Sequence, residues 1–244
     1  MKIRLDRWLA TLAFGSRSQV KDMIRQGRIN VNGNVVRDPS AAFDPDMCAL
    51  SVDGRETDGR TERHVMLHKP AGVLTAARDP KQPTVLDLLD PLYRTAGCMP
   101  VGRLDKDTTG LLILTCDGEL NHRLLAPGRH VDKVYEATVT GILGETEVRA
   151  FREGLDLKEF VAEPAELEIL GSSGEFSDAR VTVHEGKFHQ VKRMFEATGH
   201  EVTKLHRRAF GPLELDPVLG EGCWRELTEE EVKLLRRAAG MEEE

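Results

Sequence analysis

The stretch GRLDKDTTGLLIL, residues 102–114, combines a polar turn flanked by glycines with a short apolar run. Gly102 and Gly110 relax the backbone around the turn. The apolar run 111–114 predicts a buried strand that would hold the turn rigidly, and rigidly held loops commonly carry functional groups. Asp105 is therefore a candidate catalytic carboxylate. On these residues alone, the alternative that an aspartate merely caps the turn stays open.

Three blocks of the chain, in the same order, resemble pseudouridine synthases of the rRNA small-subunit synthase A type. They are GRLDKDTTGLLILTCDG at 102–118, KVYEATV at 133–139, and EGKFHQVKRMFEATG at 185–199 followed by LHR at 205–207. The resemblance covers nearly the whole chain. It implies an α+β fold with a mixed, largely antiparallel sheet and an active cleft between two lobes, whereas periodicity alone predicts only α+β.

The composition is that of a soluble globular protein of one or two domains, with 244 residues, 40% of them hydrophobic and 31% charged. Charged residues interrupt the N-terminus, so no signal-peptide core is expected there. No run approaches the roughly 20 apolar residues of a membrane-spanning helix. We therefore expect a cytoplasmic protein with no membrane partner.

The four cysteines are too widely spaced to suggest a metal site. They form no C-x-x-C pair and have no histidine at zinc-site spacing nearby; they are Cys48, Cys98, Cys116 and Cys223. We expect reduced thiols packed in the interior and no bound metal.

The charge is unevenly distributed along the chain. The net charge is −7, but residues 1–40 hold eight basic and three acidic residues, a balance of +5, which leaves −12 on the other 204 residues. Phosphate binding normally needs a basic surface. An RNA contact is therefore expected at the N-terminus, with the acidic remainder depending on it for affinity.

The N-terminal residues predict two helices followed by a hairpin. Apolar residues between 3 and 12 lie on one helical face, and Ser16-x-x-Gln19 is a capping box for a second helix that Gly27 would end. Alternation over 29–36 around an Asn-Gly pair predicts strand, turn and strand. The whole pattern resembles the S4 RNA-binding domain.

We assign the S4-like domain to residues 1–59. Lys21, Arg25 and Arg28 recur at i, i+4 and i+7, which predicts a cationic side on the second helix and the turn after it. The RNA-binding residues expected from this pattern and the resemblance are Arg4, Arg7, Arg17, Lys21, Arg25 and Arg28. The alternatives are a merely solvated helix face, and a helix-turn-helix DNA module, which would need a third helix in support.

A linker and a second domain are expected after this module. Residues 56–63 contain no apolar residue and predict a linker, so the catalytic domain is assigned to residues 60–240. Strand-like runs lie at 65–70, 111–115, 135–140, 179–184 and 201–205, and helical segments at 85–89, 145–153 and 190–198. Thr228-x-x-Glu231 predicts a capped final helix that Gly240 would end.

The resemblance implies an isomerase that needs no cofactor. Making pseudouridine breaks the N1–C1′ bond of a uridine, turns the uracil, and joins C5 to C1′. A carboxylate is sufficient as nucleophile or as a base that generates a glycal, and the residues do not decide between these routes. Asp105 matches the family's catalytic position. Lys192 matches its basic partner, and because Arg193 points roughly 100° away on the same helix, at most one of the two should face Asp105.

Other matched positions suggest substrate contacts. Tyr135 offers a ring to stack on the uracil and a phenol that could relay the C5 proton, although a strand tyrosine is often only packing. Arg103 could hold phosphate or fill the gap left by a flipped uridine. Arg193, His189 and Gln190 are also candidate substrate-binding residues, and the last two could instead only position the Lys192 helix.

Three further readings stay open beside a small-subunit rRNA synthase acting as a monomer on an assembly particle. A large-subunit rRNA synthase is disfavoured by the Asp-Thr-Thr at 107–109 and the form HQVKRM at 189–194. A non-catalytic ribosome assembly factor would be favoured by loss of the matched aspartate, tyrosine or basic residue, and all three are present. A glycoside hydrolase would need a second carboxylate paired with Asp105.

Overall fold

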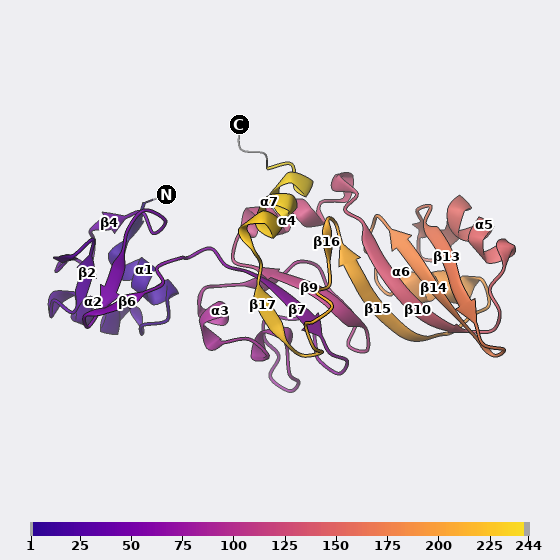
Figure 1. Cartoon of the computed structure of the whole chain (residues 1–244), viewed down its shortest axis with the longest axis horizontal. Helices are drawn as coiled ribbons and strands as arrows, with labels where there is room; N and C mark the ends of the chain where they lie inside the picture. The colour runs from indigo at the N-terminus through magenta and orange to yellow at the C-terminus, as the bar shows by residue number, and fades with distance from the viewer. Residues whose placement is uncertain (1, 242–244) are drawn as a thin grey trace.

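The computed structural model describes residues 2–241, in which an N-terminal module is joined to a larger mixed-sheet domain (Figure 1). The helices of the module are α1 (Leu5–Thr11) and α2 (Arg17–Arg25). An antiparallel sheet of order β3-β2-β5-β6 packs with them, built from β2 (Ile29–Val31), β3 (Asn34–Val35), β5 (Leu50–Val52) and β6 (Arg55–Thr57). A second small sheet pairs β1 (Ile3–Arg4) with β4 (Ala42–Phe43).

Local sequence signals fix the start of α2 and the hairpin turn. The Ser16 hydroxyl accepts from the Gln19 amide while the Gln19 side chain accepts from the Ser16 amide, so the predicted capping box is confirmed. Asn32 and Gly33 have φ of 51° and 80°, which the tight hairpin turn requires. The predicted strand, turn and strand are confirmed.

Two predicted details of the module are wrong. The first helix begins at Leu5, because Ile3 is extended and pairs with Phe43. The linker predicted at 56–63 begins too early, because Asp53 and Gly54 turn β5 into β6 and that strand runs to Thr57. A strand partner far along the chain decides both positions, and no local pattern shows it.

A mixed sheet forms the body of the larger domain and confirms the expected α+β class. Its main path within the described residues is β13-β14-β10-β15-β9-β7-β17, with β16 beside β15 and β8 beside β9. The strands are β7 (His64–Lys69), β8 (Met99–Pro100), β9 (Thr109–Thr115), β10 (Lys133–Thr140), β13 (Glu166–Ser172), β14 (Phe176–Val183), β15 (Val202–Phe210), β16 (Leu213–Glu214) and β17 (Trp224–Glu226). A separate hairpin pairs β11 (Leu155–Asp156) with β12 (Val161–Ala162).

The sheet consists of two antiparallel halves that meet at one parallel contact, between β9 and β15. Thr109 pairs with His206 and Gly110 with Arg207, and the other ladders of this sheet are antiparallel. A Cβ at Gly110, whose φ is 106°, would overlap the Arg207 backbone. The glycine therefore permits the close approach of the two halves, and it lies just after the 102–108 loop at the start of β9.

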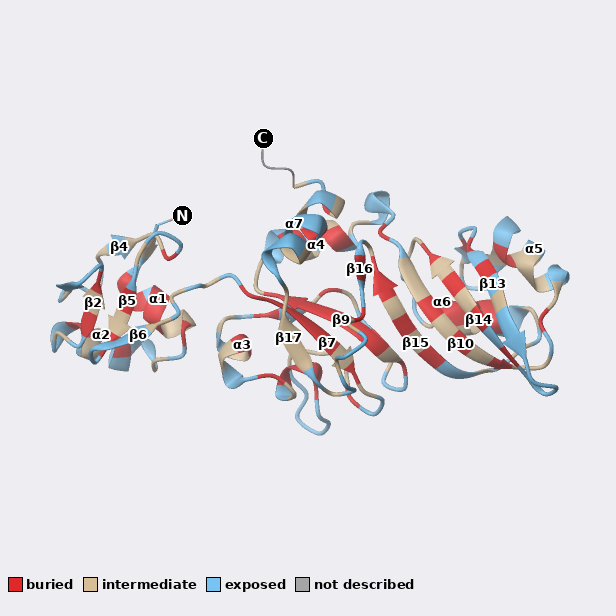
Figure 2. Cartoon of the chain, viewed as in Figure 1, coloured by how far each residue is buried: buried red, intermediate tan, exposed pale blue. Residues whose placement is uncertain are grey.

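Strands β7 and β9 are buried on both faces (Figure 2). The helices are α3 (Pro91–Thr95), α4 (Gly118–Leu125), α5 (Glu145–Glu153), α6 (Gln190–Ala197) and α7 (Glu229–Ala238), with 3₁₀ turns η1 (Val85–Asp87) and η2 (Pro127–Arg129). Because side chains alternate along a strand, Val65 and Leu112 lie in one core with α5 and α6, while Met66 and Leu111 lie in another with α4 and α7. The strand that follows the 102–108 loop is therefore packed on both faces.

The sequence predicted the long elements better than the short ones. The predicted helices near 145–153 and 190–198 are confirmed, and the Thr228–Glu231 capping box opens α7 as expected. The helix predicted at 85–89 is wrong, because only the 3₁₀ turn η1 forms there. The strand predicted at 201–205 runs on to residue 210, and α4 and β13 were not predicted.

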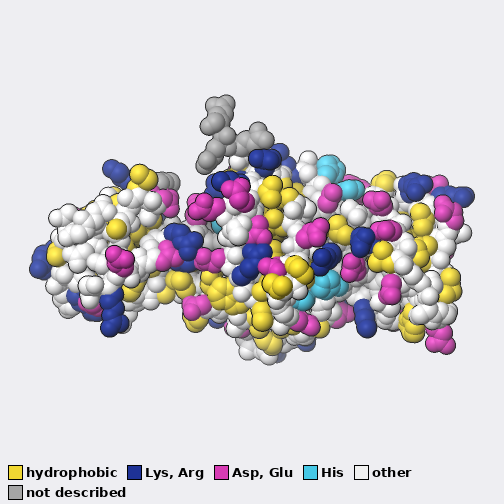
Figure 3. Space-filling model, in the orientation of Figure 1, with side chains coloured by type: hydrophobic (Ala, Val, Ile, Leu, Met, Phe, Trp, Pro, Cys, Tyr) yellow, Lys and Arg dark blue, Asp and Glu magenta, His cyan; other side chains and the backbone are white. Residues whose placement is uncertain are grey.

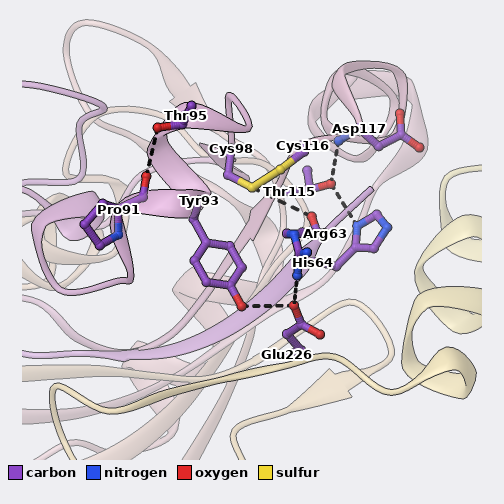
Figure 4. The surroundings of a disulfide bond; sticks show 10 residues. All are labelled: Arg63, His64, Pro91, Tyr93, Thr95, Cys98, Thr115, Cys116, Asp117 and Glu226. Atoms are coloured by element: carbon purple, nitrogen blue, oxygen red, sulfur yellow. Dashed lines mark hydrogen bonds and ion pairs between the residues drawn. A yellow bond between two sulfur atoms is a disulfide. The ribbon is translucent and has the colours of Figure 1, made fainter. Parts of the chain in front are cut away.

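A disulfide joins Cys98 to Cys116, so the expectation of reduced thiols is wrong for this pair (Figure 4). Met99 and Pro100 pair with Thr115 and Leu114, and this two-residue ladder brings the flanking cysteines together. The disulfide thus closes the base of the segment that carries Asp105. Cys48 and Cys223 are free.

Polar contacts hold the segment that connects the module to the larger domain. Trp8 Nε1 donates to the Gly59 carbonyl at 2.6 Å. Glu226 on β17 accepts from Arg60 at 2.9 Å. It also accepts from the buried Arg63 at 2.8 Å and from Tyr93 at 3.0 Å (Figure 4). Burial and this carboxylate raise the pKa of Tyr93 to about 12. The segment after β6 is therefore tied down at both ends.

Candidate active site

A cavity of about 100 Å³ lies where the two halves of the sheet meet. The 102–108 loop lines it from one half, and residues of β10, β14, β15 and the segment before α6 line it from the other. Sequence-predicted residues that line it are Arg103, Asp105, Tyr135, His189 and Gln190. Residues that lie more than 80 positions apart in the sequence thus meet at one site.

A buried lysine that the sequence analysis missed holds the backbone of the Asp105 loop by hydrogen bonds. Lys69 is fully buried, and its Nζ donates to the carbonyls of Pro70, Lys106 and Thr108 at 2.9, 3.2 and 2.9 Å. Burial lowers its pKa to about 8, opposed by the charges of the loop aspartates. The only sequence signal was a lysine that ends an apolar strand just before a proline.

Lys192 is shared between the two aspartates of the loop. Its Nζ lies 3.6 Å from Asp105 Oδ2 and 2.7 Å from Asp107 Oδ1. The hydrogen bond from Lys192 lowers the pKa of Asp107. Arg193, the next residue of α6, turns away and pairs with Glu159 at 2.7 Å. One cation of the basic pair therefore lies beside Asp105.

His189 and Gln190 differ in what they contact. His189 has φ 53° and its Nε2 lies 3.5 Å from Asp105 Oδ1, while its ring stacks on exposed Phe188 at 3.7 Å between centroids. Gln190 is buried. Its Oε1 accepts a hydrogen bond from the Lys187 amide at 3.1 Å, and its Nε2 donates to Glu185 Oε1 at 2.8 Å. Gln190 therefore holds the turn before α6, and His189 lies near the carboxylate.

Tyr135 and Arg103 lie at different depths of the site. Tyr135 on β10 is 9% exposed and packs in the core with Val181 and Leu205 while lining the cavity. Arg103 also lines the cavity but is exposed. A largely buried aromatic ring and an exposed cation thus line the same cavity.

Thr108 holds the loop through its backbone rather than through its side chain. Its side chain is buried, yet Oγ1 has no hydrogen-bond partner within the described residues, and only its amide bonds back to the Asp105 carbonyl at 3.2 Å. Asp107 braces Lys192 instead, with its own side chain 74% exposed.

Sequence reasoning also missed two cations on the far side of the cavity. Arg207 is 1% exposed, and its Nε donates to the Leu111 carbonyl at 2.8 Å. Lys133 donates to the Val131 carbonyl at 2.6 Å and lies over the Phe210 ring, and burial together with Arg207 lowers the pKa of Lys133 to about 8. Strand pairing alone brings them here, and LHR and KVY were the only signals.

The family model for RNA pseudouridylate synthases matches residues 63–197, more than half of the chain, and the S4 domain model matches residues 3–47. The chain belongs to the RNA pseudouridylate synthase family. It is thus a pseudouridine synthase that carries an S4 domain.

Relatives match this synthase over nearly its whole length. It is 41% identical to an uncharacterised RNA pseudouridine synthase of Bacillus subtilis, over 96% of this chain and 98% of that protein. Identity is 42% to ribosomal small subunit pseudouridine synthase A of Pseudomonas aeruginosa (94% and 99%) and 37% to ribosomal large subunit pseudouridine synthase B of Bacillus subtilis (97% and 96%). A crystal structure of a pseudouridylate synthase aligns with a TM-score of 0.66 at 35% identity, over 96% and 99% of the two chains.

The basic side chains of the synthase's N-terminal module lie mostly at the surface beside acidic neighbours. Arg28 pairs with Asp53 at 2.6 Å and Arg25 with Asp22 at 3.4 Å. Arg4 and Lys21 approach the same Asp6 at 2.8 and 4.0 Å, while Arg7 and Arg17 are exposed. On the face in Figure 3, acidic and basic side chains intermix over the larger domain. The face shown in Figure 3 therefore does not single out one RNA path.

Two general features of the synthase concern metals and membranes. Within residues 2–241, no group of three or more histidine, cysteine or acidic side chains could hold a metal ion. No helix in that part of the chain is long and apolar enough to cross a membrane.

Proposed function

We propose that this synthase converts a uridine of small-subunit rRNA to pseudouridine, with Asp105 attacking the ribose or abstracting a proton from it. Tyr135 stacks on the flipped uracil, Lys192 stabilises the carboxylate charge, and Arg103 occupies the opening left by the flipped base. Arg193, His189 and Gln190 support the substrate or the segment before α6. No cofactor is needed, because the reaction is an isomerisation.

The observation that carries this proposal is that Asp105 and Tyr135 line one cavity while the Lys192 ammonium lies beside Asp105. Asp105 comes from the loop before β9 and Lys192 from α6, yet they lie 3.6 Å apart. Tyr135 lines the same cavity from β10. The carboxylate can react with the ribose while the ring holds the uracil. This arrangement suits a reaction in which the uracil stays bound while its bond to C1′ changes from N1 to C5.

The small subunit is favoured by the motifs rather than by overall similarity. Relatives named for the small and the large subunit share 42% and 37% identity with this chain, a difference too small to decide. The Asp-Thr-Thr after the catalytic position and the HQVKRM form favour the small-subunit type. The alternative is a uridine of large-subunit rRNA.

The S4 module supplies most of the RNA affinity in this proposal. It carries Arg4, Arg7, Arg17, Lys21, Arg25 and Arg28, whereas the chain beyond residue 40 is net acidic. We propose that the enzyme acts as a monomer in the cytoplasm on rRNA within an assembly particle, where a folded RNA can engage both the module and the cleft.

The test is tritium release from 5-tritiated uridine in rRNA, offered as free small-subunit rRNA, free large-subunit rRNA, and assembly particles of each. Wild type, Asp105→Asn and Asp107→Asn are compared. Both aspartates contact Lys192, but Asp107 does not line the cavity. Asp105→Asn is expected to abolish release, and Asp107→Asn to lower its rate far less.

The RNA that releases tritium distinguishes between the candidate functions. Release from small-subunit substrates alone, with the modified uridine then mapped, supports the full proposal. Release from large-subunit RNA instead moves the substrate and leaves the chemistry intact. No release from any RNA, with RNA binding intact, would favour an assembly factor that retains the fold.

A further inference from the structure

Two buried polar atoms on residues that line the active-site cavity have no hydrogen-bond partner within the described residues. They are Arg207 Nη2 and Thr108 Oγ1, and each residue is 1% exposed. Buried polar groups in folded proteins are nearly always hydrogen-bonded, and an exception commonly marks a missing water, ion or ligand. The cavity is therefore built to receive a polar occupant.

Arg207 is a buried cation without a counter-ion. Its Nε bonds to the Leu111 carbonyl at 2.8 Å, and its guanidinium lies 5.3 Å from the centroid of the Phe210 ring. No carboxylate among residues 2–241 lies within ion-pair distance of Arg207, whereas Lys192 and Arg193 each have one. An unpaired buried charge is strongly unfavourable unless another group completes it.

The position of Arg207 is fixed on both sides. It pairs with Gly110 of β9, and opposite it on β10 stands Tyr135. Side chains directly opposite in an antiparallel pair share a face of the sheet. The guanidinium therefore belongs to the same face of the cleft as the tyrosine ring, and the Nε bond to β9 limits its motion.

The uracil of the substrate offers the hydrogen-bond acceptor that Arg207 Nη2 lacks. Uracil has carbonyl oxygens at C2 and C4, and when the N1–C1′ bond breaks, the electron pair stays on N1 and its charge spreads to both oxygens. A fixed donor aimed at such developing charge lowers the barrier more than it strengthens ground-state binding. Arginine has only donors, so it would also meet the amino group of cytosine unfavourably.

We propose that Arg207 donates from Nη2 to a carbonyl oxygen of the target uracil, holds the detached base as its anion, and contributes to the choice of uracil over cytosine. The inference rests on the proposed function and deepens it.

The charge balance is the same for either chemical route. C1′ gains a bond to Asp105 or becomes part of a glycal after proton loss, and the uracil leaves with the N1 electron pair. The base turns beside Arg207, and C5 bonds to C1′ as the bond between Asp105 and C1′ breaks or as C2′ of the glycal regains its proton. Removal of the C5 proton and protonation of N1 then give the neutral product. No oxidant, reductant or further reactant enters.

The test combines a protein variant with an atom change in the RNA. Wild type and Arg207→Met are compared in single turnover on an rRNA fragment that carries uridine, 2-thiouridine or 4-thiouridine at the mapped target. Sulfur accepts hydrogen bonds weakly. Arg208→Met is the matched control, because Arg208 is a half-buried neighbour on β15 that pairs with Glu214 at 3.6 Å and does not line the cavity.

With unmodified RNA, Arg207→Met is expected to lower the single-turnover rate by about 10²–10³-fold with little change in RNA affinity. One of the two thio substitutions should slow wild type and Arg208→Met about tenfold and leave Arg207→Met unaffected, because the lost contact is then already absent. If both sulfur atoms slow wild type and Arg207→Met by the same factor, Arg207 does not contact the base and the inference fails.

Arg207→Lys guards against loss of folding in the methionine variant. It keeps the charge and a donor but loses the planar fork, so its rate should lie between the other two and its response to the critical thio substitution should be reduced. An undiminished thio response in Arg207→Lys would also overturn the inference. A wild type that is inactive on all RNAs would instead refute the proposed function, so the two failures are distinguishable.

Discussion

The active-site loop and the basic side chains of the N-terminal module are held in opposite ways. The carbonyls of Lys106 and Thr108 receive hydrogen bonds from the buried Lys69. Arg25 and Arg28, by contrast, pair only with neighbouring aspartates at the surface, where their side chains are 64% and 43% exposed. Catalysis depends on a few groups in fixed positions, whereas affinity for a phosphate backbone depends on the number of charges. Single changes should therefore act strongly in one region and weakly in the other.

The largest effect expected from a single change in this comparison is at Lys192. Lys192→Met removes the cation 3.6 Å from Asp105 and is expected to lower the single-turnover rate by about 10²–10³-fold with RNA affinity nearly unchanged. Arg193→Met is the comparison, because Arg193 on the same helix pairs with Glu159 and should matter far less. Equal losses in both variants would mean that only the overall charge of α6 matters.

Deleting residues 1–59 is expected to weaken RNA binding by about 100-fold at low salt while leaving the catalytic domain folded. Near-wild-type, salt-sensitive affinity in the truncated protein would contradict this division of roles.

A milder change replaces Arg7, Arg17 and Arg25 with Gln, which keeps the module's core. It should reduce the slope of log affinity against log salt by about 1 per charge and leave the single-turnover rate at saturating RNA unchanged.

The disulfide tests how much the base of the loop contributes to stability. It joins residues 18 apart in the sequence, and closing a loop of this size stabilises by about 3 kcal/mol in the chain-entropy account. Cys98→Ala with Cys116→Ala should lower the free energy of unfolding by about that amount, measured by denaturant titration. A reducing agent should lower the stability of wild type but not of the double variant. Cys48→Ala is the control, because Cys48 is free.

The sequence predicted the elements with local signals and missed those made by distant pairing. The turn around Asp105 and the capping boxes at Ser16 and Thr228 could be found because every contributing residue lies within a few positions. The roles of Lys69 and Arg207 could not be found. They depend on β7 and β15 lying beside β9, and on a glycine that lets β9 and β15 approach. The same applies to the disulfide, which depends on the two-residue strand β8.

The candidate active site could likewise be predicted only where local geometry decides it. Helix geometry predicts that Lys192 and Arg193 diverge, and they do, toward Asp105 and Glu159. It does not predict that the shorter contact of Lys192 is to Asp107, at 2.7 Å. That preference depends on the path of a loop whose carbonyls are fixed by Lys69, a residue more than 30 positions earlier.

The smallest expected effect is a pH dependence that separates the buried lysine from a surface one. The pKa of Lys69 is lowered to about 8 by burial, from an ordinary value of 10.5. Between these two values the unfolded chain binds more protons at this residue than the folded one, so its contribution to stability rises with pH. The difference in unfolding free energy between wild type and Lys69→Met should therefore grow from pH 7.5 to pH 10, by on the order of 1–3 kcal/mol. Lys81→Met, at an exposed lysine, should show no such growth. A constant difference for Lys69→Met would mean that the ammonium is fully compensated by the carbonyls of Pro70, Lys106 and Thr108, and the loop would then be held by charge as well as by position.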